Sequence, residues 1–330
     1  MRIKGDNRGG ALLAVMWLSV ALSALAFSVA NSVRGETERT TTSTESLRAY
    51  YLASGSIDRA VLWVYWGLFG QYTNPDGSPR YYRRPMPYIR YSYESGEVLV
   101  EVIPEAGKLN VNNAKSDDLG RLLYAVGIEG ARAAQIAGGI IAYRTFADAA
   151  NQESPSSPST FHPRNASLEE LEELLLVPGM TPDIFYGRFD RDPSGHLIPR
   201  GGLRDCLTVW GAGNTIDINT APPALLESLG VAPAMVAQIV AIRTVKPFKT
   251  IDDARPFIEG APGASRLGVT GASIWTLRAT ARLRVAGGKL SDVRRTVAAV
   301  VKFLDPAKFN PPYHILRWYD DAWSPAVIPF

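Results

Sequence analysis

Near the N-terminus, 25 consecutive residues from Gly9 to Val33 carry no formal charge. As an α-helix this run would be about 38 Å long, which exceeds the roughly 30 Å of a bilayer's hydrocarbon core. A secretory signal has a shorter apolar region, of about 7–15 residues. The run therefore predicts a membrane helix that stays attached to the chain, and cleavage near Ala30, among small residues, is left open as an alternative.

Positive charge lies on one side of this run. Arg2, Lys4 and Arg8 precede it, whereas the charges that follow, between Arg34 and Arg39, cancel. Basic residues next to a membrane helix stay in the cytoplasm. We therefore expect a single-pass protein of the inner membrane, with a cytoplasmic N-terminus and most of the chain in the periplasm.

Two glycines, Gly9 and Gly10, open the uncharged run and stand before its apolar residues rather than after them. Prepilin peptidase cuts after a glycine at this place, and "NRGGALLAVMWLSVAL" resembles its leader sequences. Cleavage after Gly9, which we favour, makes Ala14 the fifth residue; cleavage after Gly10 makes it Val15. Pilins and pseudopilins carry a glutamate there, a costly charge in a bilayer, whereas this run has no acidic residue. A plain anchor with a chance "RGG" is the alternative.

The rest of the chain predicts a helix followed by an interrupted antiparallel sheet. Apolar residues from Leu47 to Leu68 recur at helical spacing, so one helix from the membrane to about Phe69 is expected. "YIRYSYESGEVLVEVIPEAG" and "WTLRATARLRVAGGKLSDVRRTVAAVVKFL" alternate in polarity around turn residues and predict two hairpins. "YHILRWY" predicts a last strand. A sheet packed on a helix, an α+β fold, accommodates this order.

The middle of the chain, about Lys108 to Ala272, contains two similar helical units. Each starts with alternating polar and hydrophobic residues that lead to asparagine, in "LNVNNA" and "TIDINTA". Each continues with a helix, a glycine turn and a second helix that ends in "AYR" or "AIR". Between the units, Ser167 is the expected N-cap of a further helix, with Glu170 three residues on. These units resemble helix-hairpin-helix or SAM-like folds.

Helix-hairpin-helix units often bind DNA, because glycines in the turn let backbone N–H groups approach a phosphate. The first turn keeps Gly127 and Gly130, one residue further apart than usual, and the second keeps only Gly230 before Ala232 and Pro233. Neither turn is followed by a Lys/Arg cluster, and the net charge of +3 is small. The sequence therefore favours packing or protein contacts over binding of nucleic acid.

One short stretch suggests a metal. Asp190, Asp192 and Ser194 stand at alternate positions before Gly195, as in the opening of a calcium-binding loop. Ile198 and Gly201 occupy the ninth and twelfth positions, where such a loop needs further oxygen ligands. A solvated turn is therefore the favoured interpretation, and a calcium site completed by distant residues is the alternative.

The sequence does not predict an enzyme. His162, His196 and His314 are not at metal-ligand spacing, and none accompanies a recognisable nucleophile motif. Cys206, the only cysteine, is expected in the core. P-loop and dinucleotide fingerprints are absent from the sequence.

Together, "RGGALLAVMWLSVALSALA", "GKLNVNNA", "TIDINTAPPALLESL" and "WTLRATARLRVAGGKLSDVRRTVAAVV" resemble the K-type minor pseudopilins of the type II secretion system. The resemblance implies a pilin-like helix and sheet with a large all-helical domain inserted between strands. It divides the chain into a leader (1–9), a transmembrane helix (10–33), its periplasmic continuation (34–72), a first part of the sheet (73–106), an inserted domain of two SAM-like units (107–272) and a second part of the sheet (273–330).

The resemblance also implies a role and partners. Members of the family lack the glutamate whose place Ala14 takes, bind calcium, and join two other minor pseudopilins, the I-type and J-type, through their N-terminal helices. The expected function is that of a pseudopilus-tip subunit that helps initiate assembly and protein export. The stretch around Asp190 and Asp192 is longer than the family leads one to expect. A membrane-anchored, competence-like DNA receptor is the alternative function, since "INTAPPALLESLGV" is similar to that group.

Overall fold

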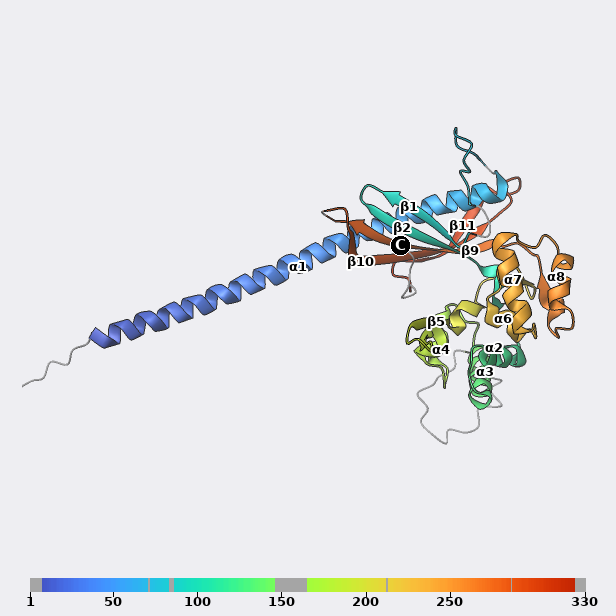
Figure 1. Ribbon diagram of the computed structural model, residues 1–330, viewed down its shortest axis with the longest axis horizontal. Helices are drawn as coiled ribbons and strands as arrows, with labels where there is room; N and C mark the ends of the chain where they lie inside the picture. The colour runs from blue at the N-terminus through green and yellow to red at the C-terminus, as the bar shows by residue number, and fades with distance from the viewer. Residues whose placement is uncertain are drawn as a thin grey trace, which may run out of the picture.

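The computed structural model describes residues 8–70, 72–82, 86–145, 165–211, 213–285 and 287–323. A single helix, α1 (Arg8–Phe69), runs far beyond the rest of the molecule at its N-terminal end and covers one face of an antiparallel sheet at the other end (Figure 1). A second, mainly helical body lies beside and below this sheet. The helix ends at Phe69, as the sequence predicts.

The C-terminal half of α1 packs on the sheet through one stripe of small and branched side chains. Ala49, Ala53, Ile57, Ala60 and Val64 recur every three or four residues and are completely buried. Three of the five are alanines, so the helix axis can approach the strands closely. This stripe and the facing strands form one hydrophobic core.

The sheet has five strands in the order β1-β2-β9-β10-β11, and every neighbouring pair is antiparallel. The strands are β1 (Tyr88–Tyr93), β2 (Gly96–Pro104), β9 (Ile274–Arg284), β10 (Leu290–Phe303) and β11 (Tyr313–Tyr319). Both hairpins and the last strand are therefore confirmed. Strands β2 and β9 are neighbours, although 169 residues separate Pro104 from Ile274, so the second body is inserted in the middle of the sheet.

The two faces of β9 differ, as its alternation predicts. Trp275, Leu277 and Ala279 point into the core beneath α1 and are at most 1% exposed. On the other face, Arg278 pairs with Glu101 of β2, with its Nε 2.5 Å from a carboxylate oxygen. This polar face is buried too, because the inserted body covers it.

The inserted body is mainly helical and has its own hydrophobic core, distinct from that of the sheet. Its first part contains η1 (Glu105–Gly107), β3 (Leu109–Asn110), α2 (Ser116–Ala125) and α3 (Gly130–Arg144). Its middle contains η3 (Leu171–Leu176), α4 (Pro182–Tyr186), β4 (Gly187–Arg191), β5 (Leu197–Gly201), α5 (Leu203–Cys206) and β6 (Leu207–Thr208). Its last part contains β7 (Ile216–Asp217), α6 (Pro223–Ser228), α7 (Pro233–Val245), α8 (Ile251–Ile258), η4 (Ala264–Arg266) and β8 (Leu267–Gly268).

The internal repeat extends to individual hydrogen bonds. In the first unit, the Asn112 side chain donates to the carbonyl of Leu168 at 2.9 Å and accepts from its amide at 2.8 Å. In the second, Asn219 makes the same two bonds with Phe248, at 3.0 and 2.8 Å. Each asparagine thus ties the start of its unit to the segment that follows the second helix. This explains why the asparagine occurs in both units.

The turns of the two units also correspond. Gly127 and Gly230 have φ angles of +94° and +87°, a region that favours glycine. The next amide in each turn, that of Ile128 or Val231, donates back to the first helix of the unit, to Leu123 or Leu226. The glycines therefore have a structural role in closing each helix-turn-helix.

Two details differ from the sequence prediction. Ser167 does not cap an α-helix: the segment forms the 3₁₀ helix η3, Glu170 is its N-cap, and the Glu173 carboxylate accepts from the Glu170 amide at 2.9 Å. The reason is that the amides that Ser167 would cap, those of Glu169 and Glu170, both donate to the Glu173 carboxylate instead. The inserted body also contains three two-stranded ladders, β3–β6, β4–β5 and β7–β8, which were not predicted.

Candidate functional site

The N-terminal part of α1 is the most unusual surface of the described chain. It includes the one described helix that is long and apolar enough to cross a membrane, with a mean hydropathy of 2.2 and no burial in its most apolar window. The large side chains there are at least 57% exposed: Leu12, Leu13, Val15, Met16, Trp17, Leu18, Val20, Leu22, Leu25, Phe27, Val29 and Val33. In water such a surface would associate or aggregate, so it needs a lipid or protein environment.

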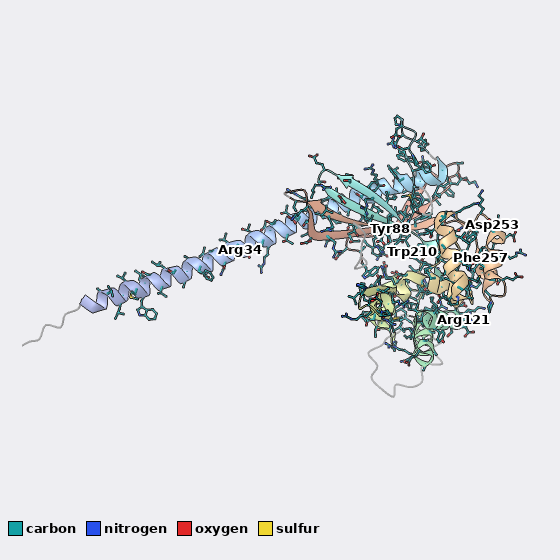
Figure 2. The ribbon with its side chains drawn as sticks, in the orientation of Figure 1. Arg34, Tyr88, Arg121, Trp210, Asp253 and Phe257 are labelled. Carbon is teal, nitrogen blue, oxygen red and sulfur yellow. The ribbon has the colours of Figure 1, made fainter. Side chains whose placement is uncertain are left out.

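The charges beyond this surface neutralise one another. Arg34 pairs with Glu38 at 3.0 Å, and Arg39 pairs with Glu36 at 3.1 Å. Figure 2 shows Arg34 on the part of α1 that projects away from the sheet. These exposed pairs mark the point where the apolar surface ends, and the helix continues through Thr40 to Thr44 before it reaches the sheet.

The predicted processing residues lie at the start of this helix. Gly9 and Gly10 belong to its first turn and Ala14 to its second, whereas residues 1–7 lie outside the described residues. The described part of the apolar run contains no Asp or Glu, and so no carboxylate that could pair with the terminal amine of a neighbouring subunit. Cleavage after Gly9 or Gly10 stays a prediction.

The predicted calcium residues come together in the β4–β5 hairpin, but other groups engage them. The Asp190 carboxylate pairs with Arg188 at 3.0 Å and with Arg200 at 3.1 Å. These bonds hold the pKa of Asp190 below its usual value, and the hydrogen bond from Arg188 has the largest effect. Asp192 accepts from the His196 amide at 2.8 Å and so closes the turn. This geometry matches a solvated hairpin in which the two carboxylates bind groups of the hairpin itself.

The described residues contain no group of three or more His, Cys, Asp or Glu side chains that could hold a metal ion. Ser194 lies in the exposed hairpin turn, and among the described residues no metal-binding group of carboxylates forms around Asp190 and Asp192. Calcium stays a prediction from the sequence. The ring of His196 lies 3.3 Å from the carboxylate of Asp192. His162 lies outside the described residues.

Cys206 is a core residue, as expected. It lies at the end of α5, is 3% exposed, and burial raises the pKa of its thiol to about 12. A thiol with that pKa is a poor nucleophile at neutral pH.

The two arginines described beside the turn at Gly230 are paired with a carboxylate. A cavity of about 830 Å³ lies between α2 and the turn at Gly230, with Arg121 and Arg266 in its wall. Both guanidinium groups bind the same carboxylate, that of Asp118, at 2.7 and 2.9 Å. Figure 2 labels Arg121 on the side of α2. Their charge is therefore half neutralised, which leaves little to attract a phosphate backbone.

Three further arginines of these units bind the protein's own backbone. Arg132 donates twice to the carbonyl of Gly179, at 3.2 and 2.9 Å. Arg144 donates to the carbonyls of Val111 and Ala114, and Arg243 to that of Ile218. These side chains hold the units together and favour the packing role that the sequence predicts.

One further surface was not predicted. A cleft of about 640 Å³ separates the polar face of the sheet from the inserted body, and Glu101, Arg278, Arg204, Tyr319 and Trp323 are among its walls. The signal for it in the sequence is the polar face of β9, where Arg278 and Thr280 alternate with core residues. Sequence alone did not indicate which segment would cover that face.

Comparisons with known proteins bear on the fold. No protein-family model matches the chain, and no curated protein matches it. Among solved structures, a chain of the GspK–GspI–GspJ complex from the type 2 secretion system of enterotoxigenic Escherichia coli is similar, with a TM-score of 0.58 and 15% identity. The alignment covers 87% of this chain and 100% of that one. The α+β fold that the sequence predicts, a pilin-like helix and sheet with a large insertion, is therefore confirmed.

Proposed function

We propose that this chain is a minor pseudopilin of a type II secretion system, placed at the tip of the pseudopilus, where it helps initiate assembly and protein export. The observation that carries the proposal is α1. One continuous helix joins an uncovered apolar segment, long enough to span a bilayer, to a stripe that packs on an antiparallel sheet. A subunit of this shape can leave the membrane and enter a bundle of similar helices without refolding.

The partners follow from the same helix and from the similar structure. The E. coli complex contains three different Gsp proteins. By analogy, this chain would join an I-type and a J-type minor pseudopilin through the apolar surface of α1. Its orientation would place the N-terminus in the cytoplasm, within reach of prepilin peptidase, and the sheet and inserted body in the periplasm.

Two features support a place at the tip. The apolar segment of α1 has no carboxylate, and Ala14 stands where a fibre subunit would use one to offset a neighbour's terminal amine. A subunit at the end of the fibre lacks one of those neighbours. The inserted body, more than 160 residues between β2 and β9, would also obstruct a subunit stacked above it.

The test of the pseudopilin role is N-terminal mass measurement after expression with and without prepilin peptidase. The proposal predicts a mass decrease that corresponds to residues 1–9, or to residues 1–10 in the alternative register. The matched control is Gly9→Leu with Gly10→Leu, which should stay full length. An unshortened wild-type chain, or cleavage near Ala30, would contradict the proposal.

The tip position is tested separately with Ala14→Glu in a reconstituted secretion system. Restoring the carboxylate should change the number or length of pseudopili, because the variant could then be incorporated as an ordinary fibre subunit. Leu13→Glu serves as control for a charge next to that position. Unchanged assembly with Ala14→Glu would remove most of the weight from the pairing argument.

The DNA-receptor alternative has a simple discriminating experiment. A gel shift on residues 35–330 should show no binding below micromolar concentration, because the arginines of the helical units bind carboxylates or backbone carbonyls of the protein itself. Salt-sensitive, sub-micromolar binding would favour the DNA receptor instead.

A further inference from the structure

The sheet and the inserted body are separate hydrophobic units that meet across a polar seam. Each has its own core, and the cleft of about 640 Å³ lies between them. The two covalent connections leave the sheet at one point, since Pro104 at the end of β2 pairs with Trp275 near the start of β9. Polar interfaces between units joined at one place allow relative motion. The contacts on the far side of the seam therefore decide how firmly the inserted body is held.

Those contacts come from the C-terminal edge of the sheet. Arg317 of β11 reaches the carboxylate of Glu170, beside η3, at 2.6 Å. The hydroxyl of Tyr319 donates to the other oxygen of the same carboxylate, also at 2.6 Å. Burial, together with this bond to Glu170, raises the pKa of Tyr319. One carboxylate of the inserted body is thus held by two side chains of one strand.

The chain beyond β11 adds a third contact. The ring of Trp323 stacks on Tyr186 of α4, with centroids 5.6 Å apart and an angle of 22° between planes. The guanidinium of Arg204, from α5, lies 4.9 Å from the Trp323 ring, and that of Arg278, from β9, lies 5.1 Å from it. One indole therefore joins a cation of the inserted body to a cation of the sheet.

Both cations are fixed by their own partners. Arg278 is bound to Glu101 on the neighbouring strand, and this pair is almost fully buried. Arg204 donates to Glu172 through two nitrogens, at 3.2 and 3.0 Å. Each guanidinium is thus paired within its own body. The Trp323 ring, which contacts both, connects the two bodies at this place.

The segment that carries the indole is anchored to the sheet and to α1. Asp320 accepts hydrogen bonds from the hydroxyl of Tyr50 at 2.7 Å and from the indole of Trp318 at 2.9 Å. The amide of Ala322 donates to the carbonyl of Thr296 in β10 at 2.9 Å. The segment therefore continues along β10 after β11 has ended.

We propose that Asp320–Trp323 is a strap that fastens the inserted body to the sheet together with the bonds of Arg317 and Tyr319 to Glu170. Withdrawal of Trp323 from the seam weakens this fastening, so that the inserted body turns about its two adjacent connections and the cleft opens. The strap is a property of the fold and does not depend on the proposed function. It makes the C-terminal edge of the sheet the place where a binding partner could change the orientation of the inserted body.

The test measures the distance between the two bodies in the full-length chain in detergent micelles. Spin labels at Ser92→Cys in β1 and Ser116→Cys in α2 sit on exposed positions of the sheet and the inserted body. Cys206 is buried with a raised pKa and should stay unlabelled. The labelled chain should give one narrow distance distribution in pulsed electron resonance, and Trp323→Ala should give a broad one.

Two companion measurements separate the strap from general damage. Trp323→Phe keeps a ring between the cations and should stay close to the narrow distribution. In hydrogen exchange, Trp323→Ala should speed exchange of the η3 amides on the order of tenfold, with β2 and β9 unaffected. A narrow distribution for Trp323→Ala would overturn the proposal, and so would broadening accompanied by faster exchange throughout the sheet.

Discussion

The two ends of α1 belong to one helix and have opposite surroundings. From Gly10 to Val33 the apolar side chains point in every direction, and all the large ones are exposed. From Ala49 to Val64 one stripe of apolar side chains is completely buried against the sheet, whereas Leu62, on another side of the helix, is 43% exposed. The first pattern is typical of a helix that is surrounded by apolar material, and the second of a helix that lies on a folded body.

The comparison shows that hydrophobicity alone does not locate a core. The more apolar end of α1 is exposed, whereas the stripe at the other end, rich in alanine, forms part of the sheet core. Burial depends on how the apolar residues are spaced, and on whether the chain provides a surface that complements them. The following predictions test this division of roles.

The largest effect should come from removal of residues 1–33. The shortened chain should leave the membrane fraction completely, because the one described span is gone, and its melting temperature should match that of the full chain in detergent. Membrane fractionation and thermal unfolding measure the two properties. A fragment that stays with membranes, or that melts much earlier, would show that the outer end of α1 has been assigned the wrong role.

A matched pair of truncations should separate the two ends next. Ile57→Ala removes a completely buried side chain from the sheet core and should lower the free energy of unfolding by roughly 3 kcal/mol, from lost transfer energy and the cavity. Leu25→Ala, at a position that is 63% exposed, should change it by less than about 0.5 kcal/mol. Denaturant titration of the two variants in the same detergent provides the measurement. Equal losses would contradict the comparison.

A second pair concerns serines that make similar local bonds. The hydroxyls of Ser56 and Ser23 each donate to the carbonyl four residues earlier, at 2.8 Å. Ser56 is buried and also lies 3.1 Å from the hydroxyl of Tyr93 in β1. Ser56→Ala should therefore cost about 1 kcal/mol of unfolding free energy, since it leaves that hydroxyl without this partner. Ser23→Ala should be neutral by the same titration, and a cost there would indicate an unrecognised contact.

Local pattern predicted much of this fold. The end of α1 at Phe69, both hairpins and the last strand follow from spacing and turn residues that lie within a few positions of each other. The repeat was visible in the sequence for the same reason, because Asn112 and Asn219 each stand at the start of a similar string. These features could be predicted because the residues that determine them are near neighbours in the chain, or because the same sequence pattern occurs twice.

Contacts between distant segments were not predictable in this way. The β3–β6 ladder joins Leu109 to Leu207, and the strap joins Trp323 to Arg204, across segments that carry no shared pattern. The error at Ser167 has a different, local origin, because the amides that it would have capped, those of Glu169 and Glu170, are bound by the carboxylate of Glu173. In the candidate site, the apolar surface of α1 was predictable from composition, whereas the pairing of Asp190 with arginines on both strands of its hairpin required the structure.

The smallest effect should appear where the two ends of α1 meet. Thr40 to Thr44 are exposed and precede the first residue that the sheet buries, Ala49. Threonine is a weaker helix former than alanine because its branched side chain loses rotamer freedom in a helix. Thr42→Ala should therefore stabilise this linking segment by about 0.5 kcal/mol, which slows exchange of the neighbouring amides roughly twofold. Hydrogen exchange on the full chain measures this, with exchange in Ala49–Val64 as the internal reference. If Thr42→Ala also slowed exchange there, the packed end of α1 would depend on the linking segment, and the helix would have to be treated as one cooperative unit rather than as two ends with separate roles.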